Sequence, residues 1–260
     1  MSGALFDLTG KTALVTGGAQ GLGRMIAEGL LRAGATVAIT SRKVDICEAA
    51  ATEMAGLGRC IALPADLSSP EAAVDLAQHF RDSLGGELHI LVNNAGKTWG
   101  GAIDSFPDRA WPGVMMVNVQ APFTLVRELL PELTAAATAD DPARVINIGS
   151  IAGATTARLS AYSYSASKAA IHMLSRDLAG DLAERNINVN AVLPGFFPTS
   201  MTAHMREDED VDPAVLGKIP MRRMGRADEI AGTVVFLSSR AGAYITGAEI
   251  PVDGGIVGCG

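Results

Sequence analysis

The chain has 260 residues, of which 48% are hydrophobic and 19% are charged, and its formal net charge is −7. This composition is typical of a globular protein, and the length is sufficient for one large α/β domain. The negative charge argues against a nucleic-acid partner, because binding to phosphate backbones depends on clustered Lys and Arg side chains. No apolar run is long enough to span a bilayer, so we expect no membrane partner either.

Short sequence signals bear on location and metal binding. Residues 1–7 contain no basic stretch followed by an apolar core, so we expect no secretory signal. Cys47, Cys60 and Cys259 are scattered without a C-x-x-C spacing, which predicts reduced thiols in a cytoplasmic protein. The four histidines show no H-E-x-x-H spacing, and we therefore predict no catalytic metal.

Strand-like apolar segments alternate with segments of helical periodicity along the chain. In chain order, we expect a strand at Thr12–Thr16, a helix at Leu22–Ala33, a strand at Thr36–Thr40, a helix at Val44–Ala55, a strand at Cys60–Leu63, a helix at Pro70–Ser83, a strand at Leu88–Val92, a helix at Arg109–Ala137, a strand at Arg144–Ile148, a helix at Ser163–Arg185, a strand at Ile187–Val192, a helix at Ala227–Leu237 and a strand at Glu249–Val252.

This alternation of strands and helices indicates the fold class. Continuously apolar strands separated by helices predict a parallel sheet covered by helices on both faces, which is a doubly wound α/β fold. No repeat or linker divides the chain, so residues 1–260 are expected to form a single domain. The long irregular stretch 196–226 is expected to act as a substrate lid.

A glycine-rich loop joins the first strand to the first helix. Glycine allows positive φ and close approach of a ligand, and the helix N-terminus favours a diphosphate. A plain tight turn is the alternative, but the position between strand and helix favours nucleotide binding. The residues expected to contact the nucleotide here are Gly17, Gln20, Gly21, Leu22 and Gly23.

The end of the second strand predicts which nucleotide binds. An acidic residue there would bind the ribose hydroxyl of NAD, whereas an arginine accommodates the 2′-phosphate of NADP. The chain has Ser41 and Arg42 at this point and no carboxylate before Asp45. We therefore expect NADP(H) to be preferred, with NAD(H) still possible, unless Arg42 and Lys43 are ordinary surface charges.

Tyr164 and Lys168 form the candidate proton-transfer pair. They lie four residues apart and so share one face of the predicted helix. A nearby ammonium is expected to lower the pKa of the phenol from its usual value near ~10. Ser150 follows a predicted strand and should reach the same crevice. Taken alone, the Tyr-x-x-x-Lys spacing is more often a surface pair.

Several further motifs accompany this pair, and together they resemble the short-chain dehydrogenase/reductase family along nearly the whole chain. The resemblance implies a single Rossmann-like domain with a seven-stranded parallel sheet. The matching segments are Thr16–Gly23, Asn93-Asn-Ala-Gly96, Asn118, Ser150, Tyr164-x-x-x-Lys168, Pro194-Gly195 with Thr199, and Asp253-Gly254-Gly255.

The resemblance implies roles for four catalytic residues. Tyr164 would be the general acid in carbonyl reduction and the base in alcohol oxidation. Ser150 would orient the substrate oxygen, and Lys168 would tune Tyr164 and bind the nicotinamide ribose. Asn118 would interrupt its helix and anchor a water in a proton relay.

The resemblance also implies further nucleotide contacts. Asp66 and Leu67 would lie beside adenine, and Thr199 would hold the carboxamide. Tyr164 and Lys168 would face the nicotinamide end. The remaining residues implied to line the cofactor are Asn93, Ala95 and Gly96 at the adenosine ribose, and Pro194 and Gly195 next to Thr199.

Within the family, the chain is most similar to the β-ketoacyl reductases associated with rhamnolipid synthesis. The similarity rests on Ile90–Gly96 with Trp99-Gly100, on Pro142–Ser150, on Ile187–Asn190 and on Pro194–Met201. It implies NADPH-dependent reduction of a ketone to a secondary alcohol, with a 3-oxoacyl or other apolar substrate.

Two other functions stay open. Gluconate 5-dehydrogenases are similar around Pro194–Thr202, so a polyol or sugar-acid dehydrogenase is one alternative. A non-catalytic NADP-binding regulator is the other, although loss of Tyr164 or Lys168 would be expected there. Both residues are present.

Substrate and partners are predicted from fewer residues. Trp99, Phe196, Phe197, Met201 and Met205 could line an apolar pocket or simply pack the lid.

Acyl carrier protein is a possible partner, but residues 138–142 are acidic and position 180 is Gly where family members acting on it present basic residues. The family resemblance implies a homotetramer, built through two long helices and the C-terminal strand.

Overall fold

The computed structural model describes residues 5–156, 160–207 and 210–259. Parallel strands form a seven-stranded sheet in the order β3-β2-β1-β4-β5-β6-β9. The predicted seven-stranded doubly wound sheet is thereby confirmed. The strands are β1 (Thr12–Val15), β2 (Thr36–Ile39), β3 (Cys60–Ala62), β4 (Ile90–Asn93), β5 (Ala143–Ile148), β6 (Ile187–Pro194) and β9 (Glu249–Val252).

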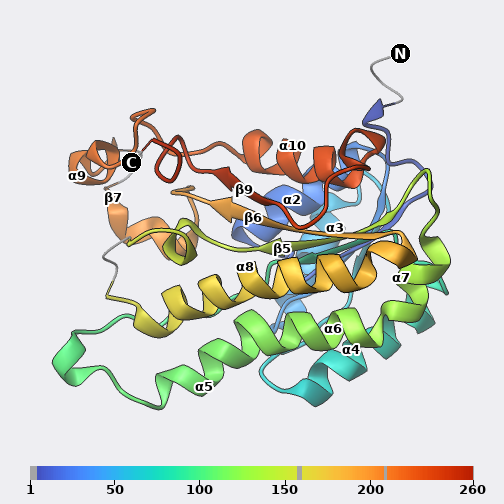
Figure 1. The fold of residues 1–260 in the computed structure, drawn as a ribbon, viewed down its shortest axis with the longest axis horizontal. Coiled ribbons are helices and arrows are strands. Elements are labelled where there is room, and N and C mark those ends of the chain that lie inside the picture. Colours follow the sequence, from blue (N-terminus) through green and yellow to red (C-terminus); the bar gives the residue numbers. More distant parts are fainter. Residues whose placement is uncertain (1–4, 157–159, 208–209, 260) are drawn as a thin grey trace.

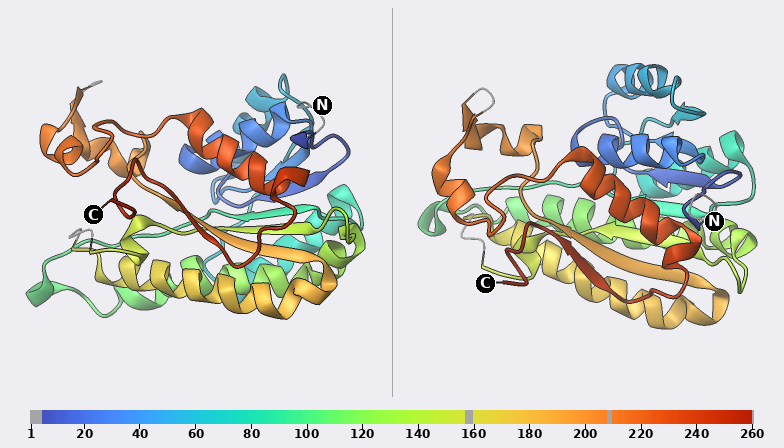
Figure 2. Two further views of the ribbon diagram at one scale, coloured as in Figure 1. Left: turned by 45° about the horizontal axis from the view of Figure 1, so that its top comes forward. Right: turned by 90° about the horizontal axis from the view of Figure 1, so that it is seen from above.

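Helices cover both faces of this sheet, as Figures 1 and 2 show. Each face has its own buried apolar cluster, one containing Ile26 and Val234 and the other containing Phe80 and Leu125. Burial on both sides explains why the strands are almost continuously apolar. The helices on the first face are α2 (Gly21–Arg32), α3 (Val44–Met54) and α10 (Ala227–Ser238); those on the second are α4 (Pro70–Leu84), α5 (Ala110–Met115), α6 (Ala121–Glu128) and α8 (Tyr162–Leu182).

Helix α4 begins and ends at residues with the expected capping chemistry. The Ser69 hydroxyl accepts a hydrogen bond from Ala72 N at 3.3 Å, and Pro70 occupies the first turn, where its missing N–H costs nothing. Gly85 ends the helix with φ +83°. These signals are readable in the sequence, and the expected helix is one residue shorter than the observed one.

The single helix expected over Arg109–Ala137 is wrong in one respect, because the structure divides it. Helix α5 runs into a π-helical turn at Met116–Gln120, followed by α6, and a break at Leu129 precedes α7 (Leu130–Ala136). A π turn holds an extra residue, so it changes the direction of the side chains without ending the helix. The apolar pattern continues through both interruptions and therefore hides them.

The segment after β6 lies at the carboxyl end of the sheet. It contains a 3-10 turn at Ser200–Met205, a short β7 (Arg206–Glu207) and β8 (Asp210–Val211) hairpin, and α9 (Pro213–Gly217). Figure 1 shows β7 and α9 at the left of the molecule, on the side toward which the β6 arrow points. The predicted lid segment thus lies at the end of the sheet where ligands bind in open α/β folds.

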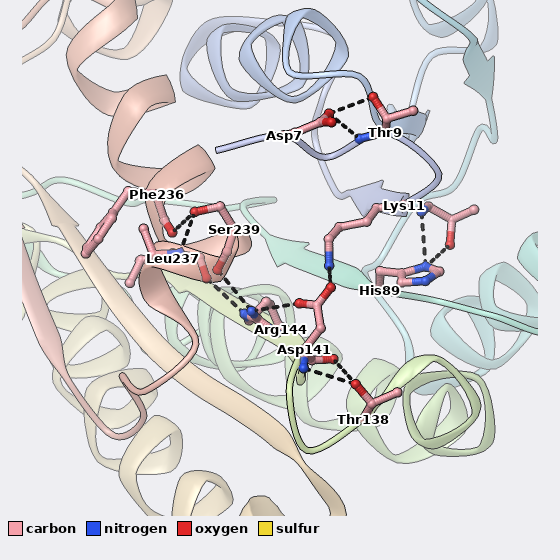
Figure 3. Close-up of polar contacts among 12 residues, drawn as sticks. Asp7, Thr9, Lys11, His89, Thr138, Asp141, Arg144, Phe236, Leu237 and Ser239 are labelled. Carbon is pink, nitrogen blue, oxygen red and sulfur yellow. Dashed lines mark hydrogen bonds and ion pairs between the residues drawn. The ribbon is translucent and has the colours of Figure 1, made fainter. Parts of the chain in front are cut away.

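The amino end of the sheet holds a buried ion cluster, which Figure 3 shows. Arg144 at the start of β5 is 1% exposed, and its Nε and Nη2 donate to Leu237 O at 3.1 Å and Ser239 O at 3.0 Å. Its Nη2 also pairs with the Asp141 carboxylate at 3.1 Å, and the Lys11 ammonium pairs with the second oxygen of Asp141. The cluster ties β1 and β5 to the end of α10.

Candidate active site

The loop between β1 and α2 can be formed only by glycine at three positions. Gly17 and Gly21 have φ of +65° and +55°, which side chains rarely tolerate. A Cβ at Gly23 would lie 2.3 Å from Gly17 O, so the first turn of α2 packs directly on the loop. The loop therefore keeps backbone N–H groups at the helix N-terminus accessible to an anion.

Neighbouring strands hold this loop in place. The Thr16 hydroxyl accepts hydrogen bonds from the N–H groups of Asn94 and Ala95, both at 2.9 Å. The Asn94 side chain donates to Thr16 O at 2.8 Å and Gly17 O at 3.2 Å, while Gly17 N donates to the Thr40 hydroxyl at 3.1 Å. The role of Asn94 was not predicted, although the residue stands within the Asn93-Asn94-Ala95-Gly96 motif.

A cavity of about 540 Å³ opens between this loop and the segment after β6. Gln20 and Gly21 line one side and Thr199 lines the other. A Cβ built on Gly21 would be 3.6 Å from the Thr199 side chain, so the two segments approach closely. Among the expected cofactor residues, the structure thus brings Thr199 to the glycine loop, and the space and the glycine backbone fit a dinucleotide.

Residues from the ends of β2 and β3 lie at the next position along this edge. Ala65 N donates to Ser41 O at 3.0 Å, which holds the two strand ends together. Arg42 and Asp66 are exposed, whereas Leu67 is buried. Arg42 is therefore free to approach a phosphate. Leu67 offers a ligand only the small part of its apolar side chain that is exposed at this edge of the sheet.

Asn93 faces the sheet rather than the crevice. Its Nδ2 donates to Asn147 Oδ1 at 2.8 Å, and Asn147 Nδ2 donates to the Ser175 hydroxyl at 2.8 Å. Asn93 is 5% exposed. Its side chain thus bonds β4 to β5, so that a contact of Asn93 with a nucleotide would have to come from its backbone.

Near the end of β6, Gly195 N donates to Val252 O at 3.0 Å. A Cβ on Gly195 would meet Asp253 Cα at 2.7 Å, so this position also requires glycine. Pro194 and Gly195 thereby direct the chain away from the sheet and toward Thr199. This arrangement explains why one side of the cavity is formed by residues so far along the chain.

The expected proton-transfer residues come together at the carboxyl end of β5. Ser150 follows that strand, and its hydroxyl accepts from Ala152 N at 3.1 Å. The Ser150 hydroxyl is near enough to Tyr164 to lower the pKa of the phenol. Lys168 is 5% exposed and its Nζ donates to Ile148 O at 2.6 Å. The same Nζ lies 5.6 Å from the centroid of the Tyr164 ring.

Asn118 is held in the π turn beside this group. It is 3% exposed, its Oδ1 accepts from Lys97 N at 2.8 Å, and its Nδ2 donates to Lys97 O at 2.9 Å and to the Ser167 hydroxyl at 2.8 Å. Ser167 precedes Lys168 on α8. The turn therefore fixes the Asn118 carboxamide between the loop after β4 and the catalytic helix.

The comparisons with known proteins agree with this geometry. A family profile described as enoyl-(acyl carrier protein) reductase matches residues 17–257. The chain belongs to the short-chain dehydrogenase/reductase family. It is therefore an oxidoreductase.

Three relatives in this family illustrate what the chain is similar to. The rhamnolipids biosynthesis 3-oxoacyl-[acyl-carrier-protein] reductase of Pseudomonas aeruginosa is 49% identical over 96% of this chain and 97% of that protein. The Pseudomonas aeruginosa RhlG/NADP active-site complex has a TM-score of 0.93 at 48% identity, covering 98% of this chain and 99% of the other. The 2-dehydro-3-deoxy-D-gluconate 5-dehydrogenase of Bacillus subtilis is 36% identical over 96% of each chain.

The ionisation of this short-chain dehydrogenase/reductase differs from the sequence expectation. Burial raises the pKa of Tyr164, and the hydrogen bond from Ser150 lowers it only in part. Burial also lowers the pKa of Lys168 to about 8. The expected lowering of the phenol pKa is absent because the hydroxyl is desolvated and the Lys168 ammonium is directed at a carbonyl.

The acidic residues 138–142, expected to disfavour an acyl carrier protein, lie at the other end of β5 from Ser150. Those residues precede β5, whereas Ser150 follows it, and six strand residues span roughly 20 Å. Asp141 there pairs with Lys11 and Arg144 instead. Gly180 likewise lies near the last turn of α8, far from Lys168. Within one copy of the chain, neither position borders the site.

The apolar residues expected near the lid fall into different environments. Phe197 is 2% exposed, and a Cβ on Gly225 would be 2.4 Å from its ring, so Phe197 packs the segment shut. Met201 is exposed, and Trp99 lies under the Arg109 guanidinium at 6.0 Å. The side chain of Met205 lies outside the described residues. Phe196 is half-buried, so Phe196, Met201 and Trp99 remain available to a substrate in the described set.

Two negative findings concern the described part of the chain. Residues 5–156, 160–207 and 210–259 include no helix with the length and hydropathy that crossing a membrane requires. Among the residues with described side chains, no group of three His, Cys, Asp or Glu residues could hold a metal ion.

Proposed function

We propose that the chain reduces a ketone to a secondary alcohol with NADPH, and that its substrate is a 3-oxoacyl thioester. The observation that carries this proposal is the meeting of Ser150, Tyr164, Lys168 and Asn118 beside a glycine cradle. The Pseudomonas aeruginosa relative is by name a 3-oxoacyl reductase, and RhlG was solved as an NADP complex, which supports both parts.

The residues that would hold the cofactor fit a dinucleotide. The loop Gly17–Gly23 would take the diphosphate on backbone N–H groups, and Ser41 with Arg42 would take the 2′-phosphate. Asp66, Leu67, Asn93, Ala95 and Gly96 would lie along the adenosine, and Pro194, Gly195 and Thr199 along the nicotinamide. When bound, NADPH supplies the hydride.

The protein residues supply the proton and the orientation. The substrate oxygen would accept hydrogen bonds from the Ser150 and Tyr164 hydroxyls; the influence of Ser150 on the pKa of Tyr164 supports this pairing. Tyr164 would give its proton to that oxygen as the carbonyl carbon receives hydride, so that C=O becomes CH–OH. A neutral phenol is the form needed for donation, and burial favours it. Lys168 and the water held by Asn118 would restore the proton.

We also propose that residues 1–260 form a single nucleotide-binding domain in which segment 196–226 acts as the substrate lid. Thr199 at the start of the segment lines the cavity next to Gly21, so closure there would exclude water from the reacting atoms.

We also propose a cytoplasmic homotetramer. Trp111, Phe123 and Met173 on α5, α6 and α8 are 38%, 41% and 52% exposed, and a second copy could cover them. Cys47, Cys60 and Cys259 are free, which suits a reducing compartment. Size-exclusion chromatography with light scattering tests the assembly, and a monomer at micromolar concentration would contradict it.

A substrate panel tests the proposed activity. NADPH oxidation is followed with 3-oxoacyl thioesters on coenzyme A and on acyl carrier protein, with aliphatic ketones, and with keto-sugar acids. We expect turnover to be greatest on a 3-oxoacyl thioester. Preference for keto-sugar acids would instead support the gluconate-type alternative, to which the Bacillus subtilis relative belongs by name. Tight NADPH binding without turnover would support a regulator.

A further inference from the structure

His172 lies on α8 one turn after Lys168, outside the catalytic set derived above. It is 4% exposed, and its Nε2 accepts a hydrogen bond from the backbone N–H of Ser150 at 3.3 Å. A buried histidine that accepts from the backbone of a candidate catalytic residue is placed to affect the orientation of that residue.

The chain around Ser150 is shaped to admit this imidazole. A Cβ on Gly149 would lie 2.3 Å from His172 Nε2. Real Cβ atoms do not approach other atoms so closely, so any larger residue at this position would displace the ring. A Cβ on Gly153 would meet the backbone of α8 first, at 2.6 Å from Ala169 N, and would lie 2.8 Å from His172 Cε1. Gly149 thus admits the ring beside Ser150, and Gly153 lets the chain after Ser150 pack against α8.

The opposite nitrogen of the ring faces a carboxylate. His172 Nδ1 lies 3.6 Å from Glu249 Oε2 on β9, and the other oxygen of Glu249 pairs with the Arg176 guanidinium. A carboxylate at this position favours the proton on Nδ1, which leaves Nε2 free to accept. The tautomer that the Ser150 contact needs is therefore the one that Glu249 stabilises.

The ring is also kept neutral. Burial lowers the pKa of His172 below its usual 6.5, and the nearby cations Lys168 and Arg176 lower it further, whereas Glu249 raises it. A protonated ring would direct an N–H at the N–H of Ser150, and the hydrogen bond would be lost. The contact therefore exists above the pKa of His172 and disappears below it.

We propose that His172 is a positioning residue that holds the backbone N–H of Ser150 and thereby orients the Ser150 hydroxyl toward Tyr164. This inference rests on the proposed function, in which that hydroxyl binds the substrate oxygen. Displacement of a catalytic group by about 1 Å can cost ~10²-fold in rate, so an effect on kcat is expected even though His172 touches no reacting atom.

Kinetics of three variants test the catalytic part. His172→Leu removes the acceptor, and we expect kcat to fall by about 10- to 100-fold while the Kd for NADPH changes by less than about twofold. His172→Gln can still accept from Ser150 N and should recover most of that loss. Asp177→Asn, an exposed change on the same helix, is the matched control and should leave kcat unaltered.

The pH profile separates positioning from simple packing. In the wild type, kcat should fall as pH drops through the pKa of His172, and this acid limb should vanish in His172→Gln. Glu249→Gln removes the charge that raises the pKa of His172, so the limb should move to lower pH. A limb that is unchanged in His172→Gln, or equal losses of kcat in the Gln and Leu variants, would overturn the proposal.

A nuclear magnetic resonance experiment tests the contact without any substrate. The chain contains the dipeptide Gly-Ser only at 149–150, so labelling with carbonyl-¹³C glycine and ¹⁵N serine selects the Ser150 amide alone. We expect its ¹⁵N shift to titrate below pH 6.5 in the wild type and to be constant in His172→Gln. A Ser150 amide that does not titrate refutes the contact, whereas titration without turnover on the substrate panel refutes the proposed function alone.

Discussion

The two ends of the sheet each bury a lysine, and they treat its charge differently. At the amino end, Lys11 pairs with Asp141, which also pairs with Arg144. At the carboxyl end, Lys168 donates only to the carbonyl of Ile148 among the described residues, and burial lowers its pKa to about 8. One ammonium is compensated by a carboxylate, and the other is not.

This difference between the two lysines indicates that one end of the sheet serves stability and the other serves reactivity. A buried charge with a partner is costly to disturb, because removal of the partner leaves the charge uncompensated. A buried charge without a partner has a shifted pKa and can exchange a proton near neutrality. The amino end therefore stabilises the fold, and the carboxyl end can carry the chemistry, as is usual for parallel α/β sheets.

The largest expected effect is at the carboxyl end. Tyr164→Phe removes the proton donor, so kcat should fall by about 10²- to 10⁴-fold. The Kd for NADPH and the melting temperature should stay near the wild-type values, because the ring still fills its place. Steady-state kinetics and a cofactor fluorescence titration measure these quantities.

Tyr162→Phe is the control for that experiment. Tyr162 lies two residues before Tyr164, is 37% exposed, and packs edge-to-face on Phe106. We expect its hydroxyl to be dispensable. Equal activity losses in the two variants would remove the distinction between the tyrosines.

At the amino end, Asp141→Asn should reduce the free energy of unfolding by about 2 kcal/mol, because Arg144 and Lys11 stay buried without their carboxylate, although solvent screens the 37% exposed Asp141 side chain. The specific activity of the folded fraction should be retained. Urea unfolding measures the loss, and the exposed neighbour variant Asp140→Asn should change stability by less than about 0.5 kcal/mol. A loss of activity without a loss of stability would contradict the assignment of a purely stabilising role to the amino end of the sheet.

The cofactor edge gives an intermediate effect. Arg42→Ala should raise the Kd for NADPH by about 10- to 100-fold, since a charge-assisted hydrogen bond contributes ~1.5–3 kcal/mol. The Kd for NADH should barely change, and Lys43→Ala should have the smaller effect on NADPH. If the wild type bound NADH more tightly than NADPH, the assignment of Ser41 and Arg42 to the 2′-phosphate would fail.

The smallest expected effect is in the acid dependence of stability. Burial alone would raise the pKa of Asp141, but Lys11 and Arg144 outweigh it, and the net pKa lies below 3.8. A carboxyl with a lowered folded-state pKa stabilises the fold above its unfolded value and loses that contribution as pH falls through the folded one. The stability gap between wild type and Asp141→Asn should therefore be constant from pH 5 to 7 and narrow below pH 3.8.

Much of this architecture is predictable from local sequence. The strand expected at Arg144–Ile148 is observed at Ala143–Ile148, because Val145, Ile146 and Ile148 are β-branched residues that favour a buried strand. The shared face of Tyr164 and Lys168 follows from their spacing alone. The glycines of the nucleotide loop were likewise recognisable, since their positive φ values need no information from distant residues.

The missed features depend on contacts between distant positions. Asn94 bonds to Thr16, 78 residues away, and His172 bonds to Ser150, 22 residues away. Neither contact has a periodicity or a cap that would reveal it. Residues 138–142 show the same dependence on tertiary structure, because they are near Ser150 in sequence but lie at the opposite end of β5 from it.

The π turn at Met116–Gln120 has a consequence for how insertions and deletions should act on this chain. Removing one residue from it would restore a regular α-helix with ordinary backbone hydrogen bonds, so the local segment would become more regular. The flanking helices α5 and α6 would keep their packed faces, because a π turn accommodates its extra residue locally and removing that residue leaves the rest of the helix in register. The change would be confined to the turn, where Asn118 contacts Lys97 and Ser167. A one-residue length difference here between this chain and a relative therefore marks the presence or absence of the turn that holds Asn118, with the packing on either side preserved.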